Sequence, residues 1–289
     1  MNTAHRAKDT TEQPASEDQA ALWNGVAGRT WVEAQELLDQ LFEPFERLLV
    51  EEVVAARTHD VLDVGCGTGA TTLAIARSLG AGGRSVGVDI SAPMIELARA
   101  RAARESVPAT FVNADAQTHA FEPACFDMLV SRFGVMFFDD SVRAFANMRR
   151  AAKRGAEVRL IAWRSPADNP FMTAAERAAA PLLPSIPPRR PDAPGQFAFA
   201  AAGRVHGILE QSGWAEIDVR PLDVSCAFPA DRLDDYLTRL GPLGRILHEA
   251  DEPTRNRIVA AVRGAFDPYI DNGEVRFDAA CWMIRARAS

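Results

Sequence analysis

The chain has 289 residues, a formal net charge of -7 and a hydrophobic share of 47%, which is ordinary for a soluble globular protein. No stretch approaches the roughly 20 apolar residues that a membrane helix requires, and the polar N-terminus lacks the apolar core of a secretion signal. The sequence therefore predicts a cytoplasmic protein without a membrane partner. The acidic balance argues mildly against nucleic acid as the main substrate.

The N-terminal part divides into a tail and a helical cap. Residues 1–20 are polar with little to bury, so we expect a disordered tail. Within residues 21–55, apolar side chains recur at helical spacing from Ala34 to Phe45, which predicts a helical cap. Pro44 predicts a helix break or the start of a second helix.

The segment 56–165 alternates short apolar strands with helices. This alternation predicts a parallel sheet with right-handed crossovers, so the expected fold class is a doubly wound α/β domain. The expected strands and helices, in chain order, are strand 61–64, a helix ending near 79, strand 84–90, helix 93–104, strand 110–113, strand 126–133, helix 142–153 and strand 158–163.

The rest of the same domain, residues 166–289, has a different pattern. Eight of the chain's 18 prolines lie between Pro166 and Pro194, which predicts an irregular segment, neither helix nor central strand, that forms part of a lid over residues 166–200. Beyond the lid the sequence predicts a helix at 203–212, a strand at 216–228, a helical insertion at 229–272 with helices at 231–240 and 254–265, and a last strand at 279–284.

The strongest motif is a strand followed by a glycine-rich turn, with the sequence VLDVGCGTG from Val61 to Gly69. Glycines let the chain turn tightly from strand to helix and let a ligand lie against bare backbone. The same stretch also satisfies the dinucleotide pattern G-x-G-x-x-A through Gly65, Gly67 and Ala70. The motif alone therefore indicates a nucleotide-type ligand without identifying it.

Three acids at successive strand ends indicate which nucleotide-type ligand the motif binds. Asp63 precedes the glycines, where a carboxylate suits a cation such as an α-amino group better than a pyrophosphate. Asp89 ends the second strand, where a carboxylate can accept both ribose hydroxyls. Asp115, before Ala116, ends the third strand, where it can accept an adenine amino proton. All three belong to the sheet edge at which doubly wound folds bind ligands.

This arrangement resembles the class I S-adenosylmethionine-dependent methyltransferases, of a bacterial small-molecule type similar to methyltransferase types 11 and 25. The resemblance covers about residues 58 to 165. It implies a Rossmann-like, mostly parallel, seven-stranded sheet, S-adenosyl-L-methionine as the cofactor, and no metal. The cofactor-binding residues that it implies are Trp31, Asp63, Gly65, Cys66, Gly67, Gly69, Asp89, Ile90, Met94, Asp115, Ala116 and Ser131.

The acceptor pocket would come from the N-terminal segment and from inserts after the later strands. Candidate acceptor contacts are Arg132, Phe133, Trp163, Arg164, Asn169 and Phe171. A sulfonium already carries an activated methyl group, so the reaction needs positioning and exclusion of water more than a catalytic side chain. The catalytic residue is unknown, with His206 and His248 as candidate bases. The expected partner is a small-molecule acceptor, and a homodimer is compatible with the sequence.

Three other functions are compatible with parts of this pattern. An NAD(P)-dependent oxidoreductase fits the glycine motif but not Asp63 or the Asp115-Ala116 pair. A non-catalytic S-adenosylmethionine-binding protein would need no enclosed acceptor. A methyltransferase for RNA or protein is disfavoured, because Ser131-Arg132-Phe133-Gly134 stands where base-methylating relatives carry N/D-P-P-Y.

Overall fold

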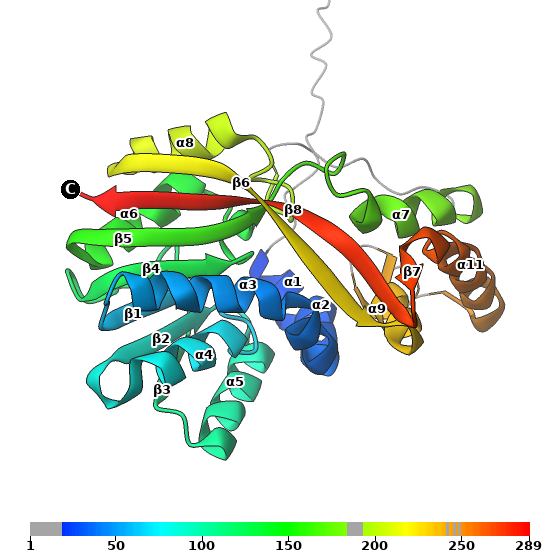
Figure 1. Cartoon of the computed structure of the whole chain (residues 1–289), viewed down its shortest axis with the longest axis horizontal. Coiled ribbons are helices and arrows are strands. Elements are labelled where there is room, and N and C mark those ends of the chain that lie inside the picture. The colour runs from blue at the N-terminus through cyan, green and yellow to red at the C-terminus, as the bar shows by residue number, and fades with distance from the viewer. Residues whose placement is uncertain (1–18, 184–192, 241–242, 245–246, 248–249) are drawn as a thin grey trace, which may run out of the picture.

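A mixed sheet crosses the molecule with the strand order β3-β2-β1-β4-β5-β8-β6, and the short β7 pairs with β8 (Figure 1). The computed structural model describes residues 19–183, 193–240, 243–244, 247 and 250–289. The strands within these residues are β1 (Asp60–Val64), β2 (Arg84–Asp89), β3 (Ala109–Asn113), β4 (Phe126–Arg132), β5 (Ala152–Trp163), β6 (Trp214–Pro229), β7 (Ile270–Asp271) and β8 (Glu274–Ala288).

The sheet is parallel from β3 to β5 and antiparallel beyond β5. Strand β1 pairs in parallel with β2 and β4, whereas β8 lies antiparallel between β5 and β6. Four of the five residues of β1 are buried, as expected for a central strand covered on both faces. The doubly wound α/β fold is thus confirmed, with seven strands on the main path and an antiparallel last strand. Its carboxyl-terminal edge brings the ends of β1, β2 and β4 together.

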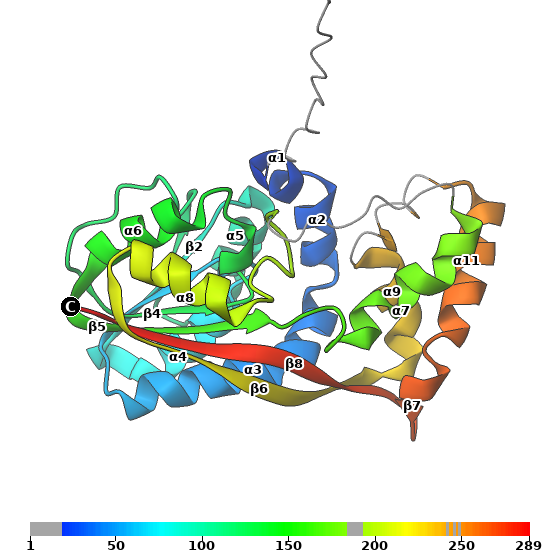
Figure 2. The same cartoon turned by 90° about the horizontal axis from the view of Figure 1, so that it is seen from above.

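Helices flank the sheet on both faces. Figure 2 shows α3 and α4 below the sheet and α6 and α8 above it. The α-helices in the described residues are α1 (Gln19–Asn24), α2 (Val26–Glu33), α3 (Gln35–Ala55), α4 (Ala70–Leu79), α5 (Ala92–Glu105), α6 (Ser141–Ala151), α7 (Pro170–Ala179), α8 (Ala202–Gln211), α9 (Leu233–Arg239) and α11 (Glu252–Gly264). Short 3-10 helices are η1 (Gly80–Gly82), η2 (Val135–Phe137), η3 (Ala180–Leu182), η4 (Ala230–Arg232) and η5 (Asp267–Tyr269).

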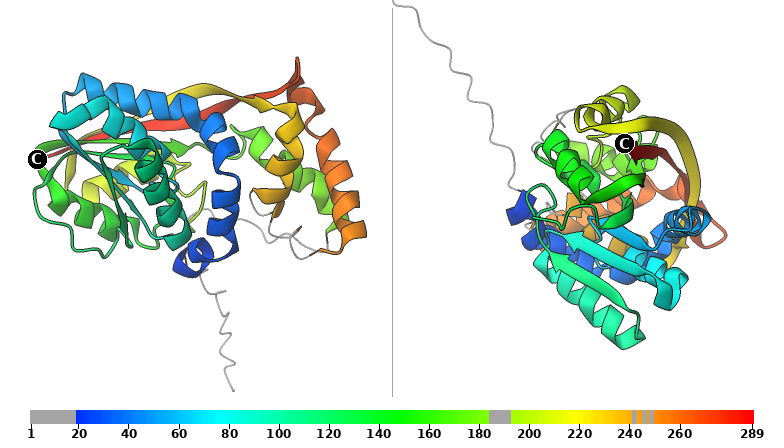
Figure 3. Two further views of the ribbon diagram at one scale, coloured as in Figure 1. Left: turned by 90° about the horizontal axis from the view of Figure 1, so that it is seen from below. Right: turned by 90° about the vertical axis from the view of Figure 1, so that its left-hand side faces the viewer.

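The second half of the chain builds a helical lobe beside this core. Strands β6 and β8 continue past the sheet as a two-stranded ribbon that reaches α9, β7 and α11 (Figure 1). Helix α7 packs against α11, and α11 against α9. Figure 3, in its left view, shows α1 and α2 between the sheet and this lobe. The lid and the insertion that the sequence predicts as separate segments therefore form one lobe that faces the N-terminal helices.

Three expectations from the sequence are corrected by these elements. Gln19 and Ala20 belong to α1, not to the tail, whose other residues lie outside the described part. Pro44 lies inside the continuous helix α3, whose apolar face is buried in the core on both sides of the proline. Part of the lid is regular, because Pro170 is at the first position of α7, where a missing N–H costs no hydrogen bond.

A search for membrane-spanning helices among the described residues finds none with the required length and hydropathy.

Candidate active site

The turn after β1 is a glycine loop (Gly65–Gly69) that requires unusual backbone angles. Gly65, Gly67 and Gly69 have φ of +69°, +55° and +87°. A Cβ atom added to Gly65 would lie 2.5 Å from the Cα of Gly134, which follows β4. The loop is therefore a tight turn pressed against the end of β4, and the backbone conformation together with this close approach requires glycine.

A smaller cavity, of about 100 Å³, lies at the carboxyl ends of β1, β2 and β4. Side chains from α1 and α2 line it from the other side. The residues singled out in the sequence that line it are Trp31, Gly65, Gly67, Asp89, Ile90, Met94, Asp115, Ala116, Arg132 and Phe133. The fold thus brings together most of the residues implied by the family resemblance.

Asp89 is buried at the rim of this cavity and is held by backbone donors. Its Oδ2 accepts a hydrogen bond from the Gly67 N–H at 2.8 Å, and its Oδ1 accepts one from the Ser91 N–H at 2.8 Å. Burial raises the pKa of the carboxyl, and the backbone hydrogen bonds oppose that rise. A carboxylate has about four acceptor positions, so Asp89 ties the glycine loop to α5 and can still accept hydrogen bonds from a ligand.

Asp115 lies on the next strand end along the same edge. Its Oδ1 accepts a hydrogen bond from the Gln117 N–H at 2.8 Å, which fixes the turn after β3. The carbonyl of Ala116 is already occupied by the Asn147 side-chain amide at 2.8 Å. The Asp115 carboxylate is therefore held in place at the cavity wall with acceptor capacity left over.

Asp63 lies behind the glycine loop, not in the cavity wall. It is 1% exposed, and the Thr72 hydroxyl donates to its Oδ2 at 2.6 Å. Burial raises the pKa of Asp63 to about 6, while the Thr72 hydrogen bond and the charge of Arg132 lower it. Because this pKa is close to neutral pH, a small change in surroundings alters how far the carboxyl beneath the loop is ionised.

Three other predicted cofactor contacts also do not line the smaller cavity. The Ser131 hydroxyl donates to the Val64 carbonyl at 2.7 Å and accepts from the Gly134 N–H at 3.1 Å, so it joins the ends of β1 and β4. Gly69 is the N-cap of α4, and a Cβ atom there would lie 2.9 Å from Ala98 and Phe111. Cys66, the third, is buried under the loop. All three support the loop's shape.

Arg132 lies in the wall of the smaller cavity, although the sequence had suggested an acceptor contact. Its guanidinium lies over the Phe42 ring at 5.4 Å and donates to the Phe42 carbonyl at 3.4 Å. No carboxylate of the described residues forms an ion pair with it, while the negative charges of Glu46, Asp39 and Asp63 act on it from a distance. Burial lowers its pKa, yet a guanidinium stays charged at physiological pH. This cation is therefore available to an anionic ligand group.

The N-terminal helices close the smaller cavity, a feature that the sequence signals only weakly. The Asn24 side chain donates to the Ile90 carbonyl at 3.1 Å and accepts from the Ala92 N–H at 2.8 Å. The Ser91 hydroxyl donates to the Trp23 carbonyl at 2.7 Å. Helix α1 is thus fastened to the turn between β2 and α5. The motif that could have found it is the Trp23-Asn24 pair, whose partners are distant in sequence.

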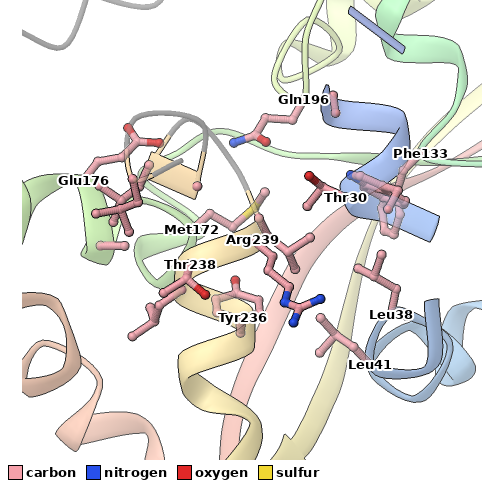
Figure 4. A pocket seen from close by; sticks show the side chains of 18 of the residues that line it. Thr30, Leu38, Leu41, Phe133, Met172, Glu176, Gln196, Tyr236, Thr238 and Arg239 are labelled. Carbon is pink, nitrogen blue, oxygen red and sulfur yellow. The ribbon is translucent and has the colours of Figure 1, made fainter. Parts of the chain in front are cut away.

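A larger cavity, of about 520 Å³, lies between the N-terminal helices and the lobe (Figure 4). Helices α2, α3, α7, α9 and α11 contribute to its lining, and so does β8. Four aromatic side chains line both cavities and so form the boundary between them; they are Trp23, Trp31, Phe133 and Phe137. The two cavities are therefore neighbours at these rings.

Comparison with known proteins finds a methyltransferase domain and similar methyltransferases. Residues 61–155 match a family described as a methyltransferase domain. The chain is 28% identical over 232 residues to the nocamycin O-methyltransferase of Saccharothrix syringae, a match that covers 77% of this chain and 82% of that protein.

The chain is a methyltransferase, with a domain of this family at residues 61–155.

The chain is also similar to a second named methyltransferase and, in its fold, to one solved structure. The methyltransferase is 32% identical over 120 residues to the aklanonic acid methyltransferase DauC of a Streptomyces species, covering 41% of this chain and 54% of that protein. Its fold is similar to that of the YcgJ protein from Bacillus subtilis, with a TM-score of 0.55 at 18% identity, over 84% of this chain and 97% of that one.

Some of the candidate acceptor contacts of the methyltransferase line the larger cavity, and others do not. Phe133, Trp163 and Phe171 line the larger cavity. Arg164 does not, because it forms ion pairs with Asp168 and Asp223. Asp168 and Asp223 therefore hold the guanidinium of Arg164 outside the lining of the larger cavity.

Two more candidate residues also lie away from both cavities. Asn169 is fully buried, and its amide exchanges two hydrogen bonds with the backbone of Ala280 at 2.9 Å each, so it joins α7 to β8 and reaches no cavity. His206 is exposed on α8 and lines neither the smaller nor the larger cavity, so its placement does not support a role as base. His248 lies outside the described residues.

Proposed function

We propose that the chain binds S-adenosyl-L-methionine in the smaller cavity and transfers its methyl group to a small-molecule acceptor in the larger one. The observation that supports this most strongly is that the two cavities share four aromatic lining residues, so that their ligands would lie side by side. The relatives named above are methyltransferases of nocamycin and aklanonic acid by name, which agrees with a small-molecule acceptor.

The nucleoside half of the cofactor fits the side chains along the sheet edge. In this proposal Asp89 accepts the ribose hydroxyls and Asp115 accepts the adenine amino proton, with the Ala116 N–H near a ring nitrogen. Ile90 and Met94 flank the adenine plane. The support is that all five residues line one cavity and that both carboxylates keep acceptor capacity.

The amino-acid half carries a carboxylate and an ammonium group and fits the other end of the cavity. The backbone of Gly65 and Gly67 lies bare there, and a Cβ atom on Gly67 would meet only the Met94 sulfur, at 3.7 Å. We assign the carboxylate of this half to Arg132, whose guanidinium has no ion-pair partner in the described residues. Asp63 supplies the compensating negative charge for the ammonium group through the loop.

Cofactor entry requires movement of the N-terminal helices. The smaller cavity measures about 100 Å³, whereas ligand pockets are usually on the order of 300 to 1,000 Å³. Its outer wall consists of side chains from α1 and α2, including Trp23 and Trp31. These helices are fastened to the core near Ser91 by a few hydrogen bonds, so an outward shift of α1 and α2 is the simplest way to enlarge the site.

The bound sulfonium supplies an activated methyl group. The protein then has to align the acceptor atom roughly 3 to 3.5 Å behind the carbon–sulfur bond and to keep water away. Phe133 and Trp163, buried and stacked at 4.2 Å, provide a rigid apolar surface for this alignment. We assign no general base, because no histidine lines the larger cavity within the described residues.

Release of S-adenosylhomocysteine tests the proposal. The chain would be incubated with S-adenosylmethionine and a panel of phenols, carboxylic acids and amines, with Asp89→Asn as the matched variant. We expect release with at least one acceptor class and a large loss of it in Asp89→Asn. Tight cofactor binding without release across the panel would favour the non-catalytic alternative instead.

A further inference from the structure

The larger cavity has an aromatic side, made of two stacked ring pairs that meet edge to face, and it begins at the boundary with the smaller cavity. Phe133 and Trp163 stack with their ring planes 3° apart. Trp163 contacts Phe171 at 6.2 Å, and Phe171 stacks on Phe277 with ring centroids 3.7 Å apart. These rings form one continuous wall from the core into the lobe. A surface of this kind favours a planar, ring-containing molecule.

Tyr236 stands on the lobe side of this cavity, away from the boundary with the smaller one. Its ring is held by Phe228, stacked at 5.1 Å, and by Phe266 at 5.9 Å. Figure 4 shows its hydroxyl directed toward the space between Met172 and Arg239. No hydrogen bond of this hydroxyl occurs within the described residues, and burial raises the pKa of the phenol, so it remains a neutral donor. The hydroxyl is not used within the protein, so it can donate a hydrogen bond to a ligand in the cavity.

The charged side chains that line the larger cavity already interact with other groups of the protein. Arg239 pairs with Glu33 at 3.4 Å, and Arg255 donates to the Leu247 carbonyl at 3.0 Å. Glu176 also has an interaction partner. Within the described residues these four are all the charged groups of the lining, so the polarity left for a ligand comes from neutral groups. The cavity is therefore suited to an uncharged molecule.

We propose that the acceptor is an uncharged, planar molecule of several fused rings with a hydroxyl or carbonyl oxygen at the end remote from the methylated atom. Tyr236 is the specificity-determining residue that donates a hydrogen bond to this oxygen. The inference rests on the proposed function, since it takes the boundary with the smaller cavity as the place of methyl transfer. The volume of about 520 Å³ leaves room for more than one ring.

A pair of probes that differ by one remote hydroxyl tests the role of Tyr236. The binding of 2,6-dihydroxyanthraquinone and of 2-hydroxyanthraquinone would be measured by quenching of tryptophan fluorescence in the wild type, in Tyr236→Phe and in Tyr269→Phe. Phenylalanine keeps the ring contacts of Tyr236. Tyr269 is the chain's other tyrosine and does not line the cavity, so it is the matched control.

We expect the wild type and Tyr269→Phe to bind the dihydroxy probe about threefold to tenfold more tightly, the worth of one neutral hydrogen bond. Tyr236→Phe should bind the two probes within about twofold. Equal binding of both probes by the wild type, or a full preference kept by Tyr236→Phe, would overturn the inference. Calorimetry with S-adenosylhomocysteine is run in parallel: its failure in the wild type would refute the proposed function, whatever the probes show.

Discussion

The carboxyl of Asp63 and the hydroxyl of Thr72 are joined by a 2.6 Å hydrogen bond beneath the glycine loop. The bond links the end of β1 to α4 and holds a buried acid in place. Burial raises the pKa of this acid to about 6 from a usual value of 3.8. The fold therefore prefers the protonated form, whereas the proposed function uses the charged form.

The first prediction concerns pH and stability. Because the folded-state pKa of Asp63 is raised, its favourable contribution is complete below about pH 4 and is lost as the pH rises through about 6. The shift of about two pKa units corresponds to about 3 kcal/mol. Asp63→Asn, which cannot ionise, should be more stable than the wild type at pH 8 by up to that amount. The gain should shrink at pH 4.5.

Chemical denaturation at the two pH values measures this difference. The exposed Asp231 on η4 gives the control, since Asp231→Asn should change stability equally at both. Asp63→Asn should also weaken the binding of S-adenosylhomocysteine at pH 8, because the neutral amide offers no charge to the ammonium group. A stability difference between Asp63→Asn and wild type that does not vary with pH would show that Asp63 is already charged without cost.

The second prediction concerns Arg132. If its guanidinium binds the ligand carboxylate, Arg132→Gln should weaken S-adenosylhomocysteine binding about tenfold to a hundredfold, the range for a charge-assisted hydrogen bond. Binding of 5′-methylthioadenosine, which has no amino-acid end, should stay nearly unchanged. Arg164→Gln is the control, since its ion pairs lie outside both cavities. An equal loss for both ligands in Arg132→Gln would mean that this arginine supports the whole site and not the carboxylate.

The third prediction separates two glycines of the same loop. In Gly65→Ala the new Cβ meets the backbone of Gly134 at 2.5 Å, so we expect a marked drop in thermal stability. In Gly67→Val the side chain meets only Met94 and fills the smaller cavity, so binding of S-adenosylhomocysteine should vanish. The fold should lose only about 1 to 3 kcal/mol from the positive φ.

Gly155 provides the control for this pair. It has φ of +81° and no neighbour within 4 Å of an added Cβ, so Gly155→Val should carry a similar backbone strain and still bind the cofactor product. Retained binding in Gly67→Val would place the ligand away from the loop.

The sheet edge could be predicted from the sequence because its signals are local. A strand, a glycine turn and a helix follow one another within residues 60–79, and Asp89 and Asp115 stand at the next two strand ends. Parallel topology then brings them together without further information. The family resemblance also predicts an antiparallel strand at the position of β8.

The acceptor side could not be predicted because its contacts are distant in sequence. Asn169 follows the fifth strand as expected, yet its amide is taken up by the backbone of Ala280, more than a hundred residues away. Conversely, no local pattern marks Tyr236, whose place depends on the path of the β6–β8 ribbon into the lobe. Position along the chain predicts which strand a side chain follows, but it does not predict which group will form hydrogen bonds with that side chain.

Calorimetric titration of the wild-type chain with S-adenosylhomocysteine and, separately, with NADH tests the central claim most directly. The glycine loop alone is compatible with either ligand, whereas the acids near it favour the first. The account predicts saturable heat with S-adenosylhomocysteine, reduced in Gly67→Val, and none with NADH. Saturable binding of NADH, with no heat from S-adenosylhomocysteine, would contradict it.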